Sequence, residues 1–182
     1  ACTSRRTTPA SSSANSRYCR RTTVRDVIER GPKAKKAVAF AVDWPGWSRG
    51  AKTPELALET LTAYRERYRP VAVAAGLGAE FDAAGALKVV EDRVGTGSTD
   101  FWGISFSPCS LETEDVDAGE LERKITLLRG TWGYFDRVAV SVSAEMRKGP
   151  RGGGRDRDHI WRHVIRNEAE QFAPVFARPA QP

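Results

Sequence analysis

The chain has 182 residues and a formal net charge of +6; 40% of its residues are hydrophobic and 29% are charged. This length allows one medium domain or two small lobes, each with a modest core. The longest uncharged apolar stretch, AVAFAV at 37–42, is far shorter than the roughly 20 residues of a bilayer-spanning helix, so no membrane association is expected.

The positive charge is concentrated at the N-terminus. Residues 1–25 contain six arginines and no acid, so the rest of the chain carries 23 basic and 23 acidic side chains. Such a neutral body lacks the pervasive positive field that drives phosphate binding, and nucleic acid is not an expected partner. A local basic candidate remains at 147–157, RKGPRGGGRDR, which we interpret as an interhelical linker.

Residues 1–21 are rich in Ser, Thr and Arg, and we predict a disordered basic tail. A transit peptide has a similar composition, but a fragment or an over-extended reading frame explains this segment equally well. The three cysteines, Cys2, Cys19 and Cys109, suggest neither a disulfide framework nor a metal site. We therefore expect a reducing, cytoplasmic environment, and Cys109 is interpreted as a small loop residue rather than a nucleophile.

The first three predicted elements lie between residue 22 and about residue 50. Residues 22–31 suit a short helix, with a strand as the alternative because several of them are β-branched. KKAVAFAVDW, residues 35–44, is the strongest strand signal, and a second short strand should open at Trp47 after a Pro-Gly turn.

A helix should then begin with Thr53 as its N-cap and Pro54 at its first position, and Pro70 should end or kink it. LKVVEDRV, residues 87–94, and TDFWGISFS, residues 99–107, suggest a hairpin or a pair of edge strands.

The second half is predicted to be helical. Apolar residues recur at a spacing of three and four from Ala118 to Lys148, with Gly130 and Gly133 marking either close packing or a kink. A second helix, capped by Asp156 or Asp158, should run to about Phe172.

Residues 37–61, AVAFAVDWPGWSRGAKTPELALETL, resemble the HicB-like antitoxin fold. The resemblance lies in a strand ending in Asp-x-Pro-Gly, then Gly-x-x-Thr, then a helix opening with Pro-Glu, and we extend it to residues 36–70. It implies a small α+β domain, a reduced relative of the RNase H fold, that binds a protein toxin and often carries a separate DNA-binding segment. No helix-turn-helix is visible in this sequence.

Residues 118–173 resemble the first two helices of a DinB-like four-helix bundle. In that family the second helix often carries a His, then an apolar residue, and a Glu five positions after the His, which here are His163, Val164 and Glu168. The resemblance implies a divalent metal held by three histidines and a thiol-dependent transferase or isomerase activity. Because the other histidines come from later helices, we expect the chain to hold only part of such a bundle.

The histidines of the second helix are the candidate metal ligands. At 100° per residue, His159, His163 and Glu170 fall within about 40° of one another, largely opposite the apolar stripe that includes Trp161. They could hold Zn or Ni with a further ligand, and the alternative is a solvated helix face. Glu168 falls on the apolar side and should reach an Arg, join an interface, or face the further helices of a full bundle.

The tryptophans offer a second kind of site. Trp44, Trp47 and Trp102 should pack in a core or at an interface between lobes, with a small hydrophobic pocket as the alternative. Together with Trp161 and Glu168 they are our candidate pocket or interface residues.

These observations predict an α+β fold: a disordered tail (1–21), a HicB-like lobe with a small sheet and one packed helix (22–110), and a two-helix hairpin (111–182). The predicted function is a non-catalytic binding or interaction module that holds a protein partner or a second copy of itself. The alternative is a DinB-like metal- and thiol-dependent enzyme.

Overall fold

The computed structural model describes residues 23–146 and 154–172. It divides into two compact units, one ending at Gly130 and the other beginning at Thr131. The predicted tail (1–21) and most of the predicted linker (147–153) lie outside the described residues. The fold is α+β, as the sequence predicts, and none of the described helices is long and apolar enough to cross a membrane.

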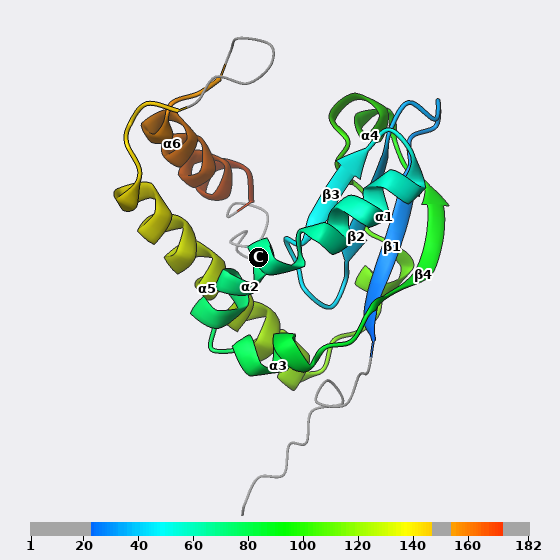
Figure 1. Cartoon of the computed structure of the whole chain (residues 1–182), viewed down its shortest axis with the longest axis horizontal. Helices are drawn as coiled ribbons and strands as arrows, with labels where there is room; N and C mark the ends of the chain where they lie inside the picture. Colours follow the sequence, from blue (N-terminus) through cyan, green and yellow to red (C-terminus); the bar gives the residue numbers. More distant parts are fainter. Residues whose placement is uncertain (1–22, 147–153, 173–182) are drawn as a thin grey trace, which may run out of the picture. The chain divides into compact units, whose positions relative to one another are not determined.

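The first unit is built on a four-stranded sheet in the order β3-β2-β1-β4 (Figure 1). β1 pairs antiparallel with β2 and parallel with β4, and β2 pairs antiparallel with β3. The strands are β1 (Val24–Arg30), β2 (Ala37–Ala41), β3 (Ser48–Ala51) and β4 (Leu87–Val94). The strands predicted near 37 and 47, and the first member of the pair at 87–107, are therefore confirmed.

Residues 24–30 form a central strand, so the predicted helix at 22–31 is wrong and its alternative is correct. Val24, Val27 and Ile28 are all buried in β1, with Val27 in a separate cluster from the other two. Burial on both faces requires the alternation of a strand, and β-branched residues fit a central strand well.

One face of the sheet is covered by α1 (Pro54–Ala63), which Figure 1 shows lying along it. As predicted, Thr53 is the N-cap, its Oγ1 accepting from Leu56 N at 3.3 Å, and Pro54 opens the helix. Alanines of β2 allow the helix to approach the strands, and Leu61 is fully buried there. The shared core consists of these residues: Val24, Ile28, Ala37, Ala39, Ala41, Trp44, Trp47, Ala57, Leu61, Tyr68, Ala72, Phe81 and Leu127.

The helix that begins at Pro54 is interrupted at Tyr64, between α1 and α2 (Arg65–Ala74), and thus earlier than the predicted break at Pro70. Pro70 lies inside α2, which is followed by α3 (Gly78–Ala83). The interruption coincides with Arg65, whose guanidinium donates to Phe81 O at 2.8 Å and to Gly85 O at 2.9 Å at the end of α3. These bonds to orphan carbonyls stabilise the connection from α3 to β4.

The segment after β4 is helical, so the predicted second strand at 99–107 is wrong. α4 (Gly97–Trp102) begins with a capping box in which Thr96 Oγ1 accepts from Ser98 N and Thr99 Oγ1 accepts from Thr96 N, each at 3.3 Å. It ends at Gly103, whose left-handed φ of 70° is typical of a helix C-cap. A 3-10 turn follows at Ser110–Glu112.

α5 (Ala118–Ser141) begins in the first unit. One of its residues there, Gly130, lies where a larger residue does not fit. A Cβ built at Gly130 would lie 2.6 Å from the Cβ of Ala75, so close packing, the first of the two predicted roles, is correct here. The helix ends before the predicted Lys148.

In the second unit α5 pairs with α6 (Arg157–Asn167), as the predicted two-helix hairpin requires. Trp132 Nε1 donates to Glu168 at 2.9 Å, Trp161 Nε1 to Asp136 at 3.3 Å, and Arg157 Nη1 to Val142 O at 2.9 Å. Asp156 is the N-cap, accepting from His159 N at 2.7 Å. A π turn, Glu168–Phe172, follows α6.

Candidate interaction surface

Four large apolar side chains follow one another at the surface, at the end of α4 and in the loop after it. Phe101, Trp102, Ile104 and Phe106 are 67%, 65%, 45% and 64% exposed. We call these four residues the aromatic ridge. Phe101 and Trp102 pack edge to face, with ring centroids 4.5 Å apart. Single exposed apolar residues are common in proteins, but such a concentrated run is typical of a binding surface.

The polar residues of the same segment point into the protein. Thr99 is fully buried, and its Oγ1 donates to Glu29 Oε1 at 2.5 Å. Ser105 Oγ donates to Glu29 Oε2 at 2.8 Å, and Ser107 Oγ accepts from Arg93 Nη2 at 3.2 Å. Residues 99–107 therefore reverse the usual arrangement, since their polar side chains face inward and their large apolar ones face outward.

Glu29 of β1 is the anchor of this segment. Its side chain is fully buried and forms a salt bridge with Arg93 of β4, which also donates to the carbonyls of Ser107 and Pro108. A Cβ built at Gly95 would lie 2.2 Å from Glu29 Oε1, so a larger residue at this position would displace the carboxylate. The buried carboxylate of Glu29 and the partly buried guanidinium of Arg93 hold their neighbours in one geometry, although Arg93 Nε has no hydrogen-bond partner among the described residues. The segment that carries the ridge is therefore anchored to the sheet.

Asp100 of α4 provides a second anchor, because it binds the loop that precedes β2. Its carboxylate accepts from Lys33 N at 2.7 Å and from Lys35 N at 2.8 Å. Burial opposes ionisation of this group, but the backbone N–H groups of residues 33, 35 and 36 outweigh it and lower the pKa of Asp100. Lys36 Nζ also donates to Phe101 O. The ridge and this loop therefore form one continuous surface.

The tryptophans predicted to share a core or a pocket occupy two different environments. Trp44 and Trp47 are buried with Tyr68 and Phe81 in an aromatic cluster whose ring centroids lie 4.8 to 6.3 Å apart. Trp102 belongs to the exposed ridge. The structure thus gives Trp44 and Trp47 the predicted core role, and it places Trp102 at the surface.

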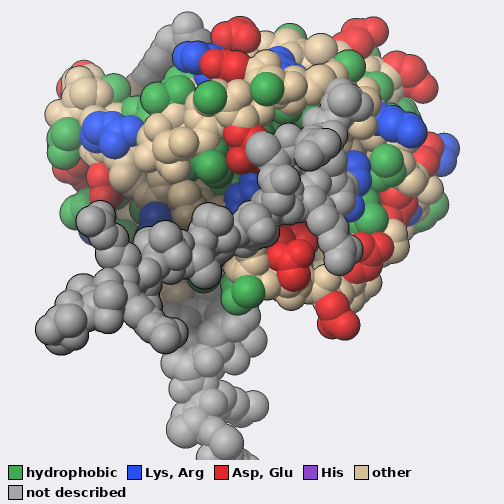
Figure 2. Space-filling view, turned by 90° about the horizontal axis from the view of Figure 1, so that it is seen from below, with side chains coloured by type: hydrophobic (Ala, Val, Ile, Leu, Met, Phe, Trp, Pro, Cys, Tyr) green, Lys and Arg blue, Asp and Glu red, His purple; other side chains and the backbone are tan. Residues whose placement is uncertain are grey.

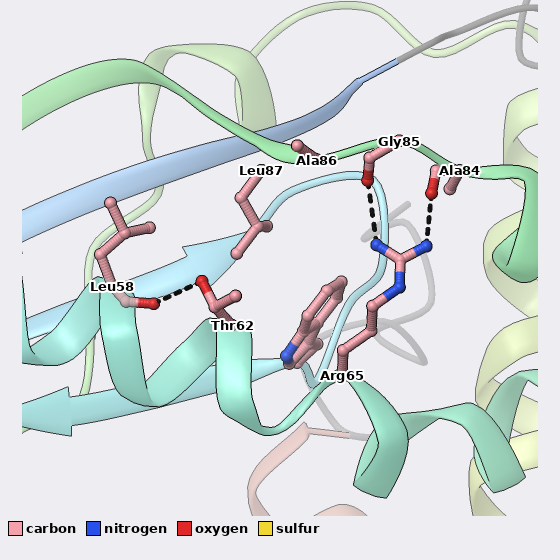
Figure 3. A pocket seen from close by; sticks show the side chains of 8 residues that line it. Leu58, Thr62, Arg65, Ala84, Gly85, Ala86 and Leu87 are labelled. Atoms are coloured by element: carbon pink, nitrogen blue, oxygen red, sulfur yellow. Dashed lines mark hydrogen bonds between the residues drawn. The ribbon is translucent and has the colours of Figure 1, made fainter.

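Trp47 also lines a pocket of about 370 Å³ beside α1 and the start of β4 (Figure 3). Leu58 and Leu87 form apolar walls, and Arg65 lies at one end, where the figure shows its guanidinium directed at the carbonyls of Ala84 and Gly85. The charged group is thus already engaged in holding the end of α3. We interpret this pocket as a product of packing.

In the second unit, two of the three candidate metal ligands, Glu170 and His163, lie beside other side chains. Glu170 Oε2 accepts from Arg166 at 2.7 Å, and His163 Nε2 lies 3.2 Å from Asn167 Nδ2. Because Glu170 lies in the π turn, the spacing of 100° per residue does not extend to it. Across residues 23–146 and 154–172, no group of three or more His, Cys, Asp or Glu side chains could hold a metal ion. The structure therefore does not bring His159, His163 and Glu170 together as a ligand set.

Glu168 and Trp161 are both part of the hairpin. Glu168 accepts from the indole of Trp132 instead of reaching an arginine. Trp161 is 43% exposed and lines a pocket of about 390 Å³ with residues of α5 and α6. Both therefore contribute to the pairing of the two helices.

Sequence reasoning identified Trp102 but missed Phe101, Ile104 and Phe106. The available signal was the alternation of polar and apolar residues at 103–107, GISFS. Alternation separates two faces, but it does not tell which of them is buried. Here the buried Glu29 decides the question in favour of the polar face.

On the face seen in Figure 2, basic and acidic side chains are interspersed. This view agrees with the neutral body indicated by the sequence.

Comparison of the chain with protein-family models, with curated proteins and with solved structures found no match. The functional inference therefore depends on the geometry described above.

Proposed function

We propose that this chain is a non-catalytic protein-interaction module that holds its partner on the aromatic ridge. The observation that carries the proposal is the reversed polarity of residues 99–107, in which Thr99, Ser105 and Ser107 face inward and the ridge faces solvent. A flexible loop could expose aromatic residues by accident. A loop held by a buried ion pair keeps them exposed permanently.

Covering the ridge with a partner should be more favourable in free energy than leaving it exposed to solvent. Full burial of a side chain such as Phe or Ile contributes roughly 1.5–3 kcal/mol, and the ridge residues forgo much of this on folding because they remain 45 to 67% exposed. Preorganised aromatic side chains are typical of binding hot spots, since little conformational entropy is lost when they are covered.

The HicB-like resemblance supports the same kind of function. It implies a small α+β lobe that binds another protein, and the first unit is an α+β lobe whose residues 37–61 carry that resemblance. A second copy of the chain is the other partner that the proposal allows.

The test is selection of a displayed library of random linear peptides on the purified chain, with light scattering to detect self-association. We expect peptides that bind the wild type and lose binding to the double variant Trp102→Ser/Phe106→Ser. Val140→Ser is the matched control, because Val140 is an 84% exposed apolar residue elsewhere. If neither ridge-dependent peptides nor ridge-dependent self-association is found, the proposal is wrong.

A further inference from the structure

We infer that the ridge recognises an acidic linear segment of a partner protein, one that carries apolar side chains between its carboxylates. This inference rests on the proposed function and adds the chemistry of the partner. It is carried by the position of the loop Gly31–Lys36, GPKAKK, which we call the lysine loop. The loop lies beside the Phe101 end of the ridge.

Two contacts fix the lysine loop against the ridge. The Asp100 carboxylate accepts from the backbone N–H groups of Lys33 and Lys35, and Lys36 Nζ donates to the carbonyl of Phe101. A Cβ built at Gly31 would lie 2.0 Å from Asp100 Oδ1, so the loop passes directly over this carboxylate. The backbone of the loop and the side chain of Lys36 are thereby engaged, while the side chains of Lys33 and Lys35 remain available.

The ammonium groups of Lys33 and Lys35 are exposed, and neither forms a salt bridge with any residue of the part that the structure describes. The carboxylate of Asp100, beneath the loop, accepts from the backbone N–H groups of Lys33 and Lys35 rather than from their ammonium groups. Basic groups beside an apolar surface select partners with carboxylates at matching positions, because opposite potentials favour association and like charges oppose it.

The shape of the surface favours a linear segment. A hollow of about 170 Å³ lies between Pro32, Lys33, Lys35, Gly97, Asp100 and Phe101. This volume admits a single side chain of a partner. A segment lying along the ridge would place one apolar side chain in the hollow and flanking carboxylates at Lys33 and Lys35.

The test uses the peptides selected on the wild-type chain. We expect an excess of Asp and Glu in the ridge-dependent peptides. Their affinity for Lys33→Glu/Lys35→Glu should be about fivefold or more weaker, and rising salt should weaken binding to the wild type. The neutral variant Lys33→Gln/Lys35→Gln should give an intermediate loss, and Lys88→Glu, an exposed lysine of β4, should give none. Melting temperatures of all variants verify that they fold.

The outcomes separate the two proposals. Ridge-dependent peptides without an acidic excess, or with unchanged affinity for Lys33→Glu/Lys35→Glu, overturn the inference and leave the proposed function intact. Absence of any ridge-dependent binding overturns both.

Discussion

Two carboxylates of β1, Asp26 and Glu29, are both fully buried but differ in their surroundings. Glu29 is bonded to Arg93, Thr99 and Ser105. Neither oxygen of Asp26 has a hydrogen-bond partner among the residues that the structure describes. Burial raises the pKa of Asp26 to about 7, and the nearby N–H groups of Phe40 and Val27 offset this only in part. The strand thus holds one carboxylate that builds the site and one that opposes folding when ionised.

The pH dependence of stability should reflect the ionisation of Asp26. Its pKa is higher in the folded state than the unfolded value of 3.8, so the folded chain binds the additional proton. The free energy of unfolding should therefore fall as pH rises from about 4 to about 7, by on the order of 3 kcal/mol from this group, and then level off.

Asp26→Asn should remove most of this slope, as measured by urea denaturation at several pH values. Asp26→Val should raise stability at pH 8, because valine suits a buried strand. A slope equal to that of the wild type in Asp26→Asn would contradict the assignment.

Glu29 should contribute far more to stability than an exposed acid. Glu29→Ala leaves Arg93 buried without its carboxylate, and we expect a loss of about 3–5 kcal/mol in the free energy of unfolding. The control is Asp82→Ala, since the salt bridge of Asp82 with Arg69 has both side chains nearly half exposed; its loss should be at most about 1 kcal/mol. Chemical denaturation measures both, and equal losses would show that Glu29 is not an anchor.

At the scale of elements, α5 offers a pair of glycines with opposite expectations. Gly130→Ala would force its Cβ against Ala75 and should destabilise by about 1–3 kcal/mol, despite the better helix propensity of alanine. Gly133→Ala meets nothing closer than 3.8 Å and should stabilise by up to about 1 kcal/mol. Urea midpoints of the two variants test this, and shifts in the same direction would contradict the packing of α5 on α2.

The metal prediction for α6 can be tested directly. Because His159, His163 and Glu170 do not form a ligand group, we expect purified protein to hold no stoichiometric zinc or nickel. Metal analysis of the wild type and of His163→Ala should then give the same result, with no change of melting temperature on chelation. Stoichiometric metal lost in the variant would instead favour the DinB-like enzyme.

At the scale of the whole molecule, the sequence predicted those elements whose local signals agree with their environment. The α+β class, β2 and the cap of α1 follow from turn residues, an N-cap and a buried apolar run. The predictions for β1 and α4 are wrong because tertiary contacts, and not local signals, determine the secondary structure of these two segments. β1 is a strand through its pairing with β2 and β4, and α4 is held by Thr99 on a buried glutamate distant in sequence.

The candidate site was only partly predictable for the same reason. Trp102 could be singled out by its residue type, but exposure of its neighbours depends on Glu29 and Arg93, which lie on two separate strands. Nothing local in GISFS shows that its serines rather than its aromatic residues face inward.

The binding role of the ridge is tested most directly by the backbone and indole N–H signals of the protein in an NMR titration with a selected peptide. The chain has five tryptophans, of which Trp44 and Trp47 are buried, so their indole signals serve as internal controls. We predict that the indole of Trp102 and the amides of residues 101–106 shift most, while those of Trp44 and Trp47 stay in place. Largest shifts at any other surface, with the Trp102 indole unchanged, would contradict the account.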